Sequence, residues 1–112
     1  MSKKMLQFTK LNKQNPDKRE TGKRKGDFKE IYDEFINDKA TEQSSRCSQC
    51  GVPFCQIHCP LSNNIPDWLK LTAEGRLKEA YELSQSTNNM PEVCGRICPQ
   101  DRLCEGNCVI EQ

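Results

Sequence analysis

The sequence predicts a small all-α fold that is organised by bound metal more than by an apolar core. The chain has 112 residues, of which only 34% are hydrophobic, and its mean hydropathy is −0.87. A chain this short and polar buries little apolar surface and needs another source of cohesion. Amphipathic helical segments are present, whereas alternating β-branched runs typical of strands are absent. All eight cysteines lie between Cys47 and Cys108.

The start of the chain determines which chemistry the cysteines are expected to have. Residues 1–8 lack the continuous apolar stretch of a secretory signal, and no run approaches the ~18 apolar residues of a membrane span. We therefore expect a cytoplasmic protein without membrane contact. Because disulfides are rare in reducing compartments, the cysteine count favours metal binding.

Charge divides the chain into two predicted parts. Residues 1–26 carry nine Lys/Arg against two acidic residues, a formal +7, and residues 27–112 carry a formal −6. We expect 1–26 to be a basic, flexible arm that keeps the chain in solution or contacts an acidic partner surface. Nucleic-acid binding by this arm is not favoured, because no aromatic side chain for base stacking is interleaved with its basic run.

Helices are predicted in order along the remaining chain. The first runs from Asp27 to about Lys39, since Asp27 and Glu30 resemble a capping box and five apolar residues share one helical face. These are Phe28, Ile31, Tyr32, Phe35 and Ile36. We expect this apolar stripe to be buried against the cysteine-rich domain or against another domain.

Shorter helices are predicted between and before the cysteine groups. Pro66 suits a helix start and Gly75 a helix stop. A second helix covers 76–84, a turn follows at 87–91, and 91–95 can form one helical turn.

The cysteine spacing carries the main functional signal. The first group reads C-x2-C-x4-C-x3-C-P, and the second reads C-x3-C-x5-C-x3-C. Zinc sites usually pair two short C-x2–4-C turns, whereas here one stretch offers four thiols and ends in Cys59-Pro60. In two-cluster ferredoxins the Cys-Pro cysteine ligates the other cluster. We interpret the pattern as two [4Fe–4S] clusters with crossed ligands, in which Cys108 returns to the first cluster.

Two ligand sets follow from this interpretation. The first set contains Cys47, Cys50, Cys55 and Cys108, and the second contains Cys59, Cys98 and Cys104. Backbone amides near Gly51, Gly95 and Gly106, and the charges of Arg46, Arg96 and Arg102, are expected to offset the negative charge of the thiolates.

Two other uses of the cysteines remain open from spacing alone. One is a zinc-stapled binding module with a basic arm that contacts nucleic acid, in which His58 would be a possible ligand. The other is a set of disulfides, which the lack of a signal sequence disfavours.

Two longer stretches resemble a known family. Residues 46–66 (RCSQCGVPFCQIHCPLSNNIP) and 87–108 (TNNMPEVCGRICPQDRLCEGNC) are similar to the N-terminal domain of the glutamate synthase small (β) subunit, which also occurs at the front of dihydropyrimidine dehydrogenase. The resemblance covers residues 27–112. It implies an α-helical ferredoxin-like fold with two [4Fe–4S] clusters and the same two ligand sets. In the family the remaining ligand of the second cluster is a Glu or Gln farther downstream, and the position of Cys94 is generally not a ligand.

The resemblance also implies a function. In the family, NAD(P)H reduces FAD in the domains that follow, and electrons pass through the clusters to an active site on a partner, the large subunit of glutamate synthase. We expect 27–112 to be the cluster domain that precedes such flavin and nucleotide domains, because no G-x-G-x-x-G is present here. Alone, this chain is expected to relay electrons without substrate turnover.

Overall fold

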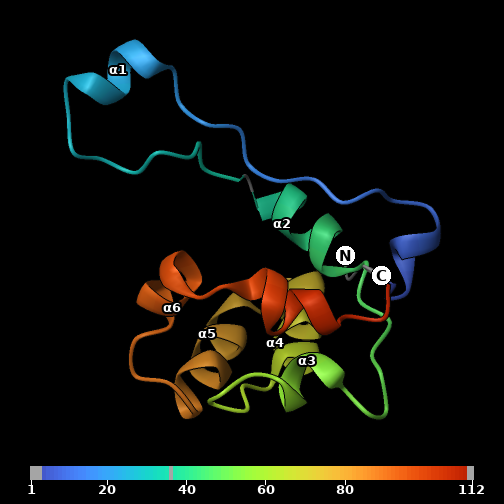
Figure 1. Ribbon diagram of the computed structural model, residues 1–112. Coiled ribbons are helices and arrows are strands. Elements are labelled where there is room, and N and C mark those ends of the chain that lie inside the picture. Colours follow the sequence, from blue (N-terminus) through green and yellow to red (C-terminus); the bar gives the residue numbers. More distant parts are fainter. Residues whose placement is uncertain (1–3, 36, 111–112) are drawn as a thin grey trace.

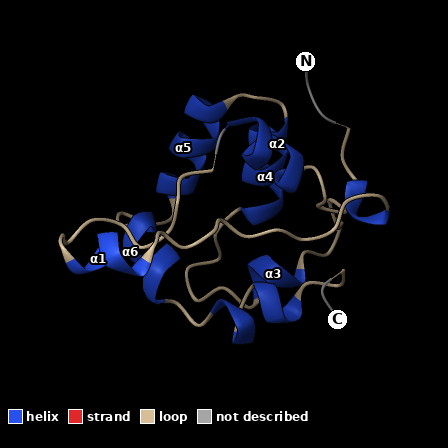
Figure 2. Cartoon of the chain, turned by 90° about the horizontal axis from the view of Figure 1, so that it is seen from above, coloured by secondary structure: helices blue, strands red, loops and turns tan. Residues whose placement is uncertain are grey.

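The computed structural model describes residues 4–35 and 37–110, which form a helical body and a loop that projects from it (Figure 1). No strand occurs among the described residues, which confirms the all-α class (Figure 2). The α-helices are α1 (Thr21–Lys25), α2 (Asn37–Ser44), α3 (Phe54–Ile57), α4 (Ile65–Ala73), α5 (Leu77–Ser86) and α6 (Pro91–Ile97). Three short 3-10 helices are η1 (Gln7–Thr9), η2 (Gln100–Arg102) and η3 (Glu105–Asn107).

Helix α4 is the centre of the body, since it packs against both α5 and α2. Pro66 lies in its first turn, and Gly75 follows its end with a φ of 79°, a left-handed conformation that glycine adopts without strain. Both sequence signals for this helix are therefore confirmed. Among the described apolar residues, Ala73, Ala80 and Pro66 are the buried ones, so the apolar core is as small as the composition predicted.

The cysteine groups are carried by short helices and turns around this centre. Helix α3 contacts both α4 and η3, and η2 packs against η3, so the first cysteine group meets the end of the second. Helix α6 extends two residues beyond the predicted turn at 91–95. A Cβ on Gly106 would lie 1.9 Å from the Asp101 carbonyl oxygen, so only glycine fits where η2 and η3 meet.

The first residues of the basic segment are bound to the body. The Leu6 and Gln7 amides donate to the carbonyls of Cys47 and Ser45, at 3.0 and 2.9 Å. The Arg46 Nε donates to the Leu11 carbonyl at 2.9 Å. This segment therefore lies alongside the chain that enters the first cysteine group.

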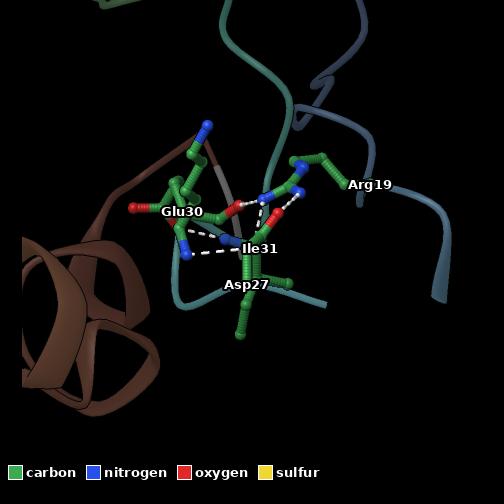
Figure 3. Close-up of polar contacts among 5 residues, drawn as sticks. Arg19, Asp27, Glu30 and Ile31 are labelled. Atoms are coloured by element: carbon green, nitrogen blue, oxygen red, sulfur yellow. Dashed lines mark hydrogen bonds and ion pairs between the residues drawn. The ribbon is translucent and has the colours of Figure 1, made fainter. Parts of the chain in front are cut away.

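Residues 17–33, here called the projecting loop, contain α1 at their tip, and α1 lies away from α2, α3 and α4 in both views (Figures 1 and 2). An antiparallel bridge between Lys18 and Tyr32 closes the base of the loop. Within it, the Arg19 guanidinium faces the Asp27 carboxylate (Figure 3), with Nη2–Oδ2 and Nη1–Oδ1 distances of 2.6 and 3.3 Å. The Arg19 Nη1 also donates to the Glu30 carbonyl at 2.8 Å.

The predicted helix from Asp27 to Lys39 is wrong over residues 27–35, which are irregular, and a helix begins only with α2. The two presumed capping residues form local turns instead. Asp27 Oδ1 accepts from the Lys29 amide at 3.0 Å, and Glu30 Oε1 accepts from the Ile31 amide at 3.0 Å. Acidic side chains that satisfy nearby amides compete with the helical hydrogen bonds.

The first three members of the apolar stripe are not buried against the cysteine-rich domain, and their burial against another domain stays a prediction. Phe28 is fully exposed, and Ile31 and Tyr32 are 47% and 45% exposed. Phe35 is half-buried, and Ile36 lies outside the described residues. The projecting loop thus presents apolar side chains to its surroundings.

None of the helices within the described ranges has the length and apolar content that a bilayer crossing requires.

Candidate metal centre

A cavity of about 330 Å³ lies where the two cysteine groups meet. Its thiol lining comes from the turn before α3, from α3 itself and from both sides of η3, and consists of Cys47, Cys50, Cys55, Cys104 and Cys108. The other walls are largely apolar and include Phe54, Ile65, Pro66 and Leu69. The structure therefore brings all four residues of the first predicted ligand set to one cavity, together with Cys104.

The cavity and its donors fit an iron–sulfur cluster. One water molecule needs roughly 10–15 Å³ of such space, so this cavity has room for a group of many atoms. Sulfur donors are the ligands that iron–sulfur clusters take. Apolar walls limit solvent access, which is one of the factors that set a cluster's potential.

The thiols at this cavity are close enough to influence one another's ionisation. Burial raises the pKa of the Cys55 thiol to about 11, and the negative charges of Cys47, Cys108 and Cys104 add to the effect. Burial likewise raises the pKa of Cys104. Crowded thiols resist becoming thiolates unless a cation offsets their charge, as a bound metal does.

Cys104 connects this cavity to the other predicted ligands. Its pKa is raised by the charge of Cys59 as well as that of Cys108. The pKa of Cys98 is also raised. Partial burial is the largest cause, and a hydrogen bond with Cys94 and the charges of Cys104 and Cys59 add to it. The second predicted set, Cys59, Cys98 and Cys104, is therefore also gathered in one place, beside the first.

Cys94 lies next to this second set. In addition to its contact with Cys98, its Sγ accepts a hydrogen bond from Asn88 Nδ2 at 3.3 Å. Asn88 is buried, and its Oδ1 also accepts from the Met90 amide at 2.9 Å. The Cys94 side chain is thus held by a protein donor.

The alternatives to a cluster gain no support from the geometry. Among the described residues, no three His, Cys, Asp or Glu side chains are placed to hold a single metal ion, as a zinc site would require. His58 is exposed at the end of α3. All eight cysteines are free thiols.

Two polar residues between the first cysteines were not singled out by the sequence analysis. Ser48 Oγ lies 3.0 Å from Cys50 Sγ. Gln49 directs both its backbone amide and its Nε2 at Cys47 Sγ, at 3.4 and 3.3 Å. The signal available in the sequence was the polar pair inside C-x2-C, since side chains at these positions lie beside the sulfurs.

The arginines expected near the thiolates differ in their surroundings. Arg46 lines the cavity. Arg96 forms an ion pair with Glu30 of the projecting loop, so its charge is already balanced. Arg102 is exposed in η2.

Comparisons with known proteins agree with the sulfur-lined site. Residues 24–112 match the family described as dihydropyrimidine dehydrogenase domain II, 4Fe–4S cluster. The chain is 68% identical over 111 residues to the glutamate synthase [NADPH] small chain of Azospirillum brasilense, which covers 99% of this chain. The corresponding small chain of Escherichia coli K12 is 52% identical over 110 residues, a match that covers 98% of this chain. That of Bacillus subtilis 168 is 39% identical over 112 residues, a match that covers 92% of this chain.

The match covers only part of these relatives. This chain spans 23% of the Azospirillum and Escherichia proteins and 22% of the Bacillus protein.

Proposed function

This chain belongs to the dihydropyrimidine dehydrogenase domain II family of 4Fe–4S domains, in the form carried by glutamate synthase small chains, and we propose that it holds two [4Fe–4S] clusters. The first cluster is bound by Cys47, Cys50, Cys55 and Cys108. The second is bound by Cys59, Cys98 and Cys104. A 4Fe–4S electron-transfer role is shared by the family, and the number of clusters and their ligands are our proposal.

The observation that carries the proposal is the meeting of the two cysteine groups at one cavity. Cys108 lines the same space as Cys47 and Cys50 although it lies far along the chain. Cys59, from the first group, is a close electrostatic neighbour of Cys98 and Cys104. This exchange of one cysteine between the groups is what crossed ligation of two clusters requires.

A bound [4Fe–4S] cluster accepts and donates one electron at a time. The chain's own residues hold the thiolates, line the cavity with apolar side chains such as Phe54 and Leu69, and place polar donors beside the sulfurs. Cys104 lines the first cavity, and its charge acts on Cys98 of the second set, which supports two neighbouring sites whose short separation favours electron transfer.

We place this domain between a flavin and an acceptor enzyme. The relatives are named glutamate synthase [NADPH] small chains. In line with the family resemblance, the proposed donor is an FAD reduced by NAD(P)H on further domains, and the proposed acceptor is the active site of the glutamate synthase large subunit. Glutamate formation, and hence ammonia assimilation, is the process served.

The projecting loop is the part of the chain best suited to hold that large partner. Fully exposed Phe28 lies between a basic tip, with Lys23, Arg24 and Lys25, and the partly exposed Ile31. A partner that receives this loop has an apolar pocket with acidic residues at its rim. The rival function, a zinc-stapled nucleic-acid module, is not favoured, because the family match is to 4Fe–4S domains.

Metal analysis of anaerobically purified protein tests the proposal. Two [4Fe–4S] clusters require about eight iron and eight acid-labile sulfide per chain, with broad visible absorption. About four of each means a single cluster. Stoichiometric zinc without sulfide contradicts the proposal outright.

A further inference from the structure

The segment between Cys47 and Cys50 contains two hydrogen-bonding side chains, and each contacts a different sulfur. Ser48 Oγ is 3.0 Å from Cys50 Sγ, and Gln49 Nε2 is 3.3 Å from Cys47 Sγ. We propose that Ser48 and Gln49 are positioning residues that raise the reduction potential of the first cluster by donating hydrogen bonds to two of its thiolates. This inference rests on the proposed function of the cavity.

Gln49 is fixed in the orientation that this role needs. Its Nε2 also donates to the Pro66 carbonyl at 2.7 Å, which ties the side chain to the first turn of α4. The amide therefore bridges a cluster ligand and the central helix of the body. Because the Nε2 group contacts the Pro66 carbonyl as well as Cys47, the side chain presents its N–H group to the sulfur without further ordering.

The backbone at Gln49 supports the same conclusion. Its φ is 53°, in the left-handed region that a residue with a Cβ adopts at a cost. This conformation accompanies a second donation to the same sulfur, from the Gln49 backbone amide at 3.4 Å. Cys47 thus receives two N–H groups from one residue.

The direction of the bond from Ser48 follows from cluster chemistry. Between a hydroxyl and a free thiol either group can donate. Cys50 bound to iron is a thiolate without a proton, so the hydroxyl must then be the donor.

The effect on potential has a definite sign. Reduction adds one negative charge to the cluster and its thiolates. Donors directed at those sulfurs stabilise the added charge, so they favour the reduced form and raise the potential. The sulfur contacts of Ser48 and Gln49 are with Cys50 and Cys47, both of the first set, so the effect should be confined to the first cluster.

The test is an EPR-monitored redox titration of the cluster-loaded chain. Gln49→Leu removes the side-chain donor, and Gln49→Glu removes it and adds a negative charge. Ser48→Ala removes the hydroxyl. We expect each variant to lower the first-cluster potential, Gln49→Glu most, with Gln49→Leu giving about a tenfold change in the one-electron equilibrium, or ~59 mV. The second-cluster potential should stay unchanged.

Matched controls separate tuning from general disturbance. Gln56→Leu removes a glutamine amide that bonds Asn64 Oδ1 rather than sulfur, and Ser84→Ala removes a hydroxyl that bonds the Tyr81 carbonyl. Both should leave the potentials unchanged.

Unaltered first-cluster potentials in Ser48→Ala and Gln49→Leu at full iron content overturn the inference while the proposed function stands. If only Gln49→Leu loses iron, Gln49 has a structural role and its tuning role is overturned. The first-cluster potential of Ser48→Ala then tests the tuning role of Ser48 separately. Wild-type protein that assembles no cluster contradicts the proposed function itself.

Discussion

The guanidinium of Arg19 and the carboxylate of Asp27 form a two-point ion pair, with Nη2–Oδ2 at 2.6 Å, that closes the projecting loop. Bidentate pairs of this kind fix geometry as well as charge. The hydrogen bond from Arg19 lowers the pKa of Asp27, so this ion pair should persist until the pH falls below the ordinary range of an aspartate. Its consequence is that Phe28 stands exposed next to a basic helix.

Removing Phe28 is expected to weaken assembly without affecting folding. Phe28→Ala removes a fully exposed ring, so the melting temperature of the free chain should not change. Association of the complete small subunit with the large subunit should weaken, measurable by titration calorimetry. Ile97→Ala, which removes a 75% exposed apolar side chain outside the loop, is the control. Undiminished association in Phe28→Ala rules out the loop as the docking element.

Unlike Phe28, Phe35 is half-buried, so its replacement is expected to affect the stability of the free chain. Its replacement by Ala should destabilise the chain by less than the ~3–5 kcal/mol typical of a fully buried Phe. Chemical unfolding of Phe35→Ala measures this cost, and a full core-sized loss would show that the ring is part of the core.

Cysteine substitutions test how the ligands are divided. Cys50→Ala should abolish the first cluster and roughly halve the iron content, because the second set keeps its thiols. Cys94→Ala should be mild, since Cys94 belongs to neither predicted set although it contacts Cys98. Iron analysis with EPR compares them. Iron content that halves in Cys94→Ala would instead make Cys94 a ligand.

Arg46 and Arg96 should differ in their influence on potential. Arg46 lines the cavity, whereas Arg96 is not among its lining residues and pairs with Glu30 of the projecting loop. Arg46→Gln should therefore lower the potential of the first cluster, because a nearby positive charge favours the more anionic reduced form. Arg96→Gln serves as the control. Identical potentials in wild type and Arg46→Gln would leave Arg46 with a purely structural role.

Metal-free, reduced protein should lose stability at alkaline pH. The Cys55 thiol ionises near its ordinary pKa of 9.0 when unfolded, but only at about 11 in the fold. Above pH ~9 the unfolded chain releases a proton that the folded chain keeps, so stability falls as pH rises through this window. The melting temperature should fall less in Cys55→Ser than in wild type between about pH 9 and pH 11. Equal slopes would mean that burial of Cys55 is not the cause.

Local signals were sufficient to predict much of the body. The start of α4 at Pro66 and its end before Gly75 follow from backbone chemistry that needs no distant partner. The cysteine spacing likewise indicated that the end of the second group returns to the first, and Cys108 lines the same cavity as Cys47, while the division of the ligands between two clusters stays a prediction.

The projecting loop could not be predicted in the same way. The periodicity of Phe28, Ile31 and Tyr32 suits a helix, but Arg19 and Lys18 lie outside that window and hold residues 27–33 in an irregular form. The contact of Gln49 with Pro66 could not be predicted either, because it forms only when the fold brings α4 next to Gln49.

The central claim is that the two cysteine groups jointly hold two neighbouring clusters. Stepwise reduction of the anaerobic protein, with EPR spin quantitation, tests it most directly. The account predicts about two spins per chain at full reduction, with signals broadened by magnetic interaction, because Cys104 adjoins both thiol sets. A single, unbroadened spin per chain in fully iron-loaded protein would contradict it.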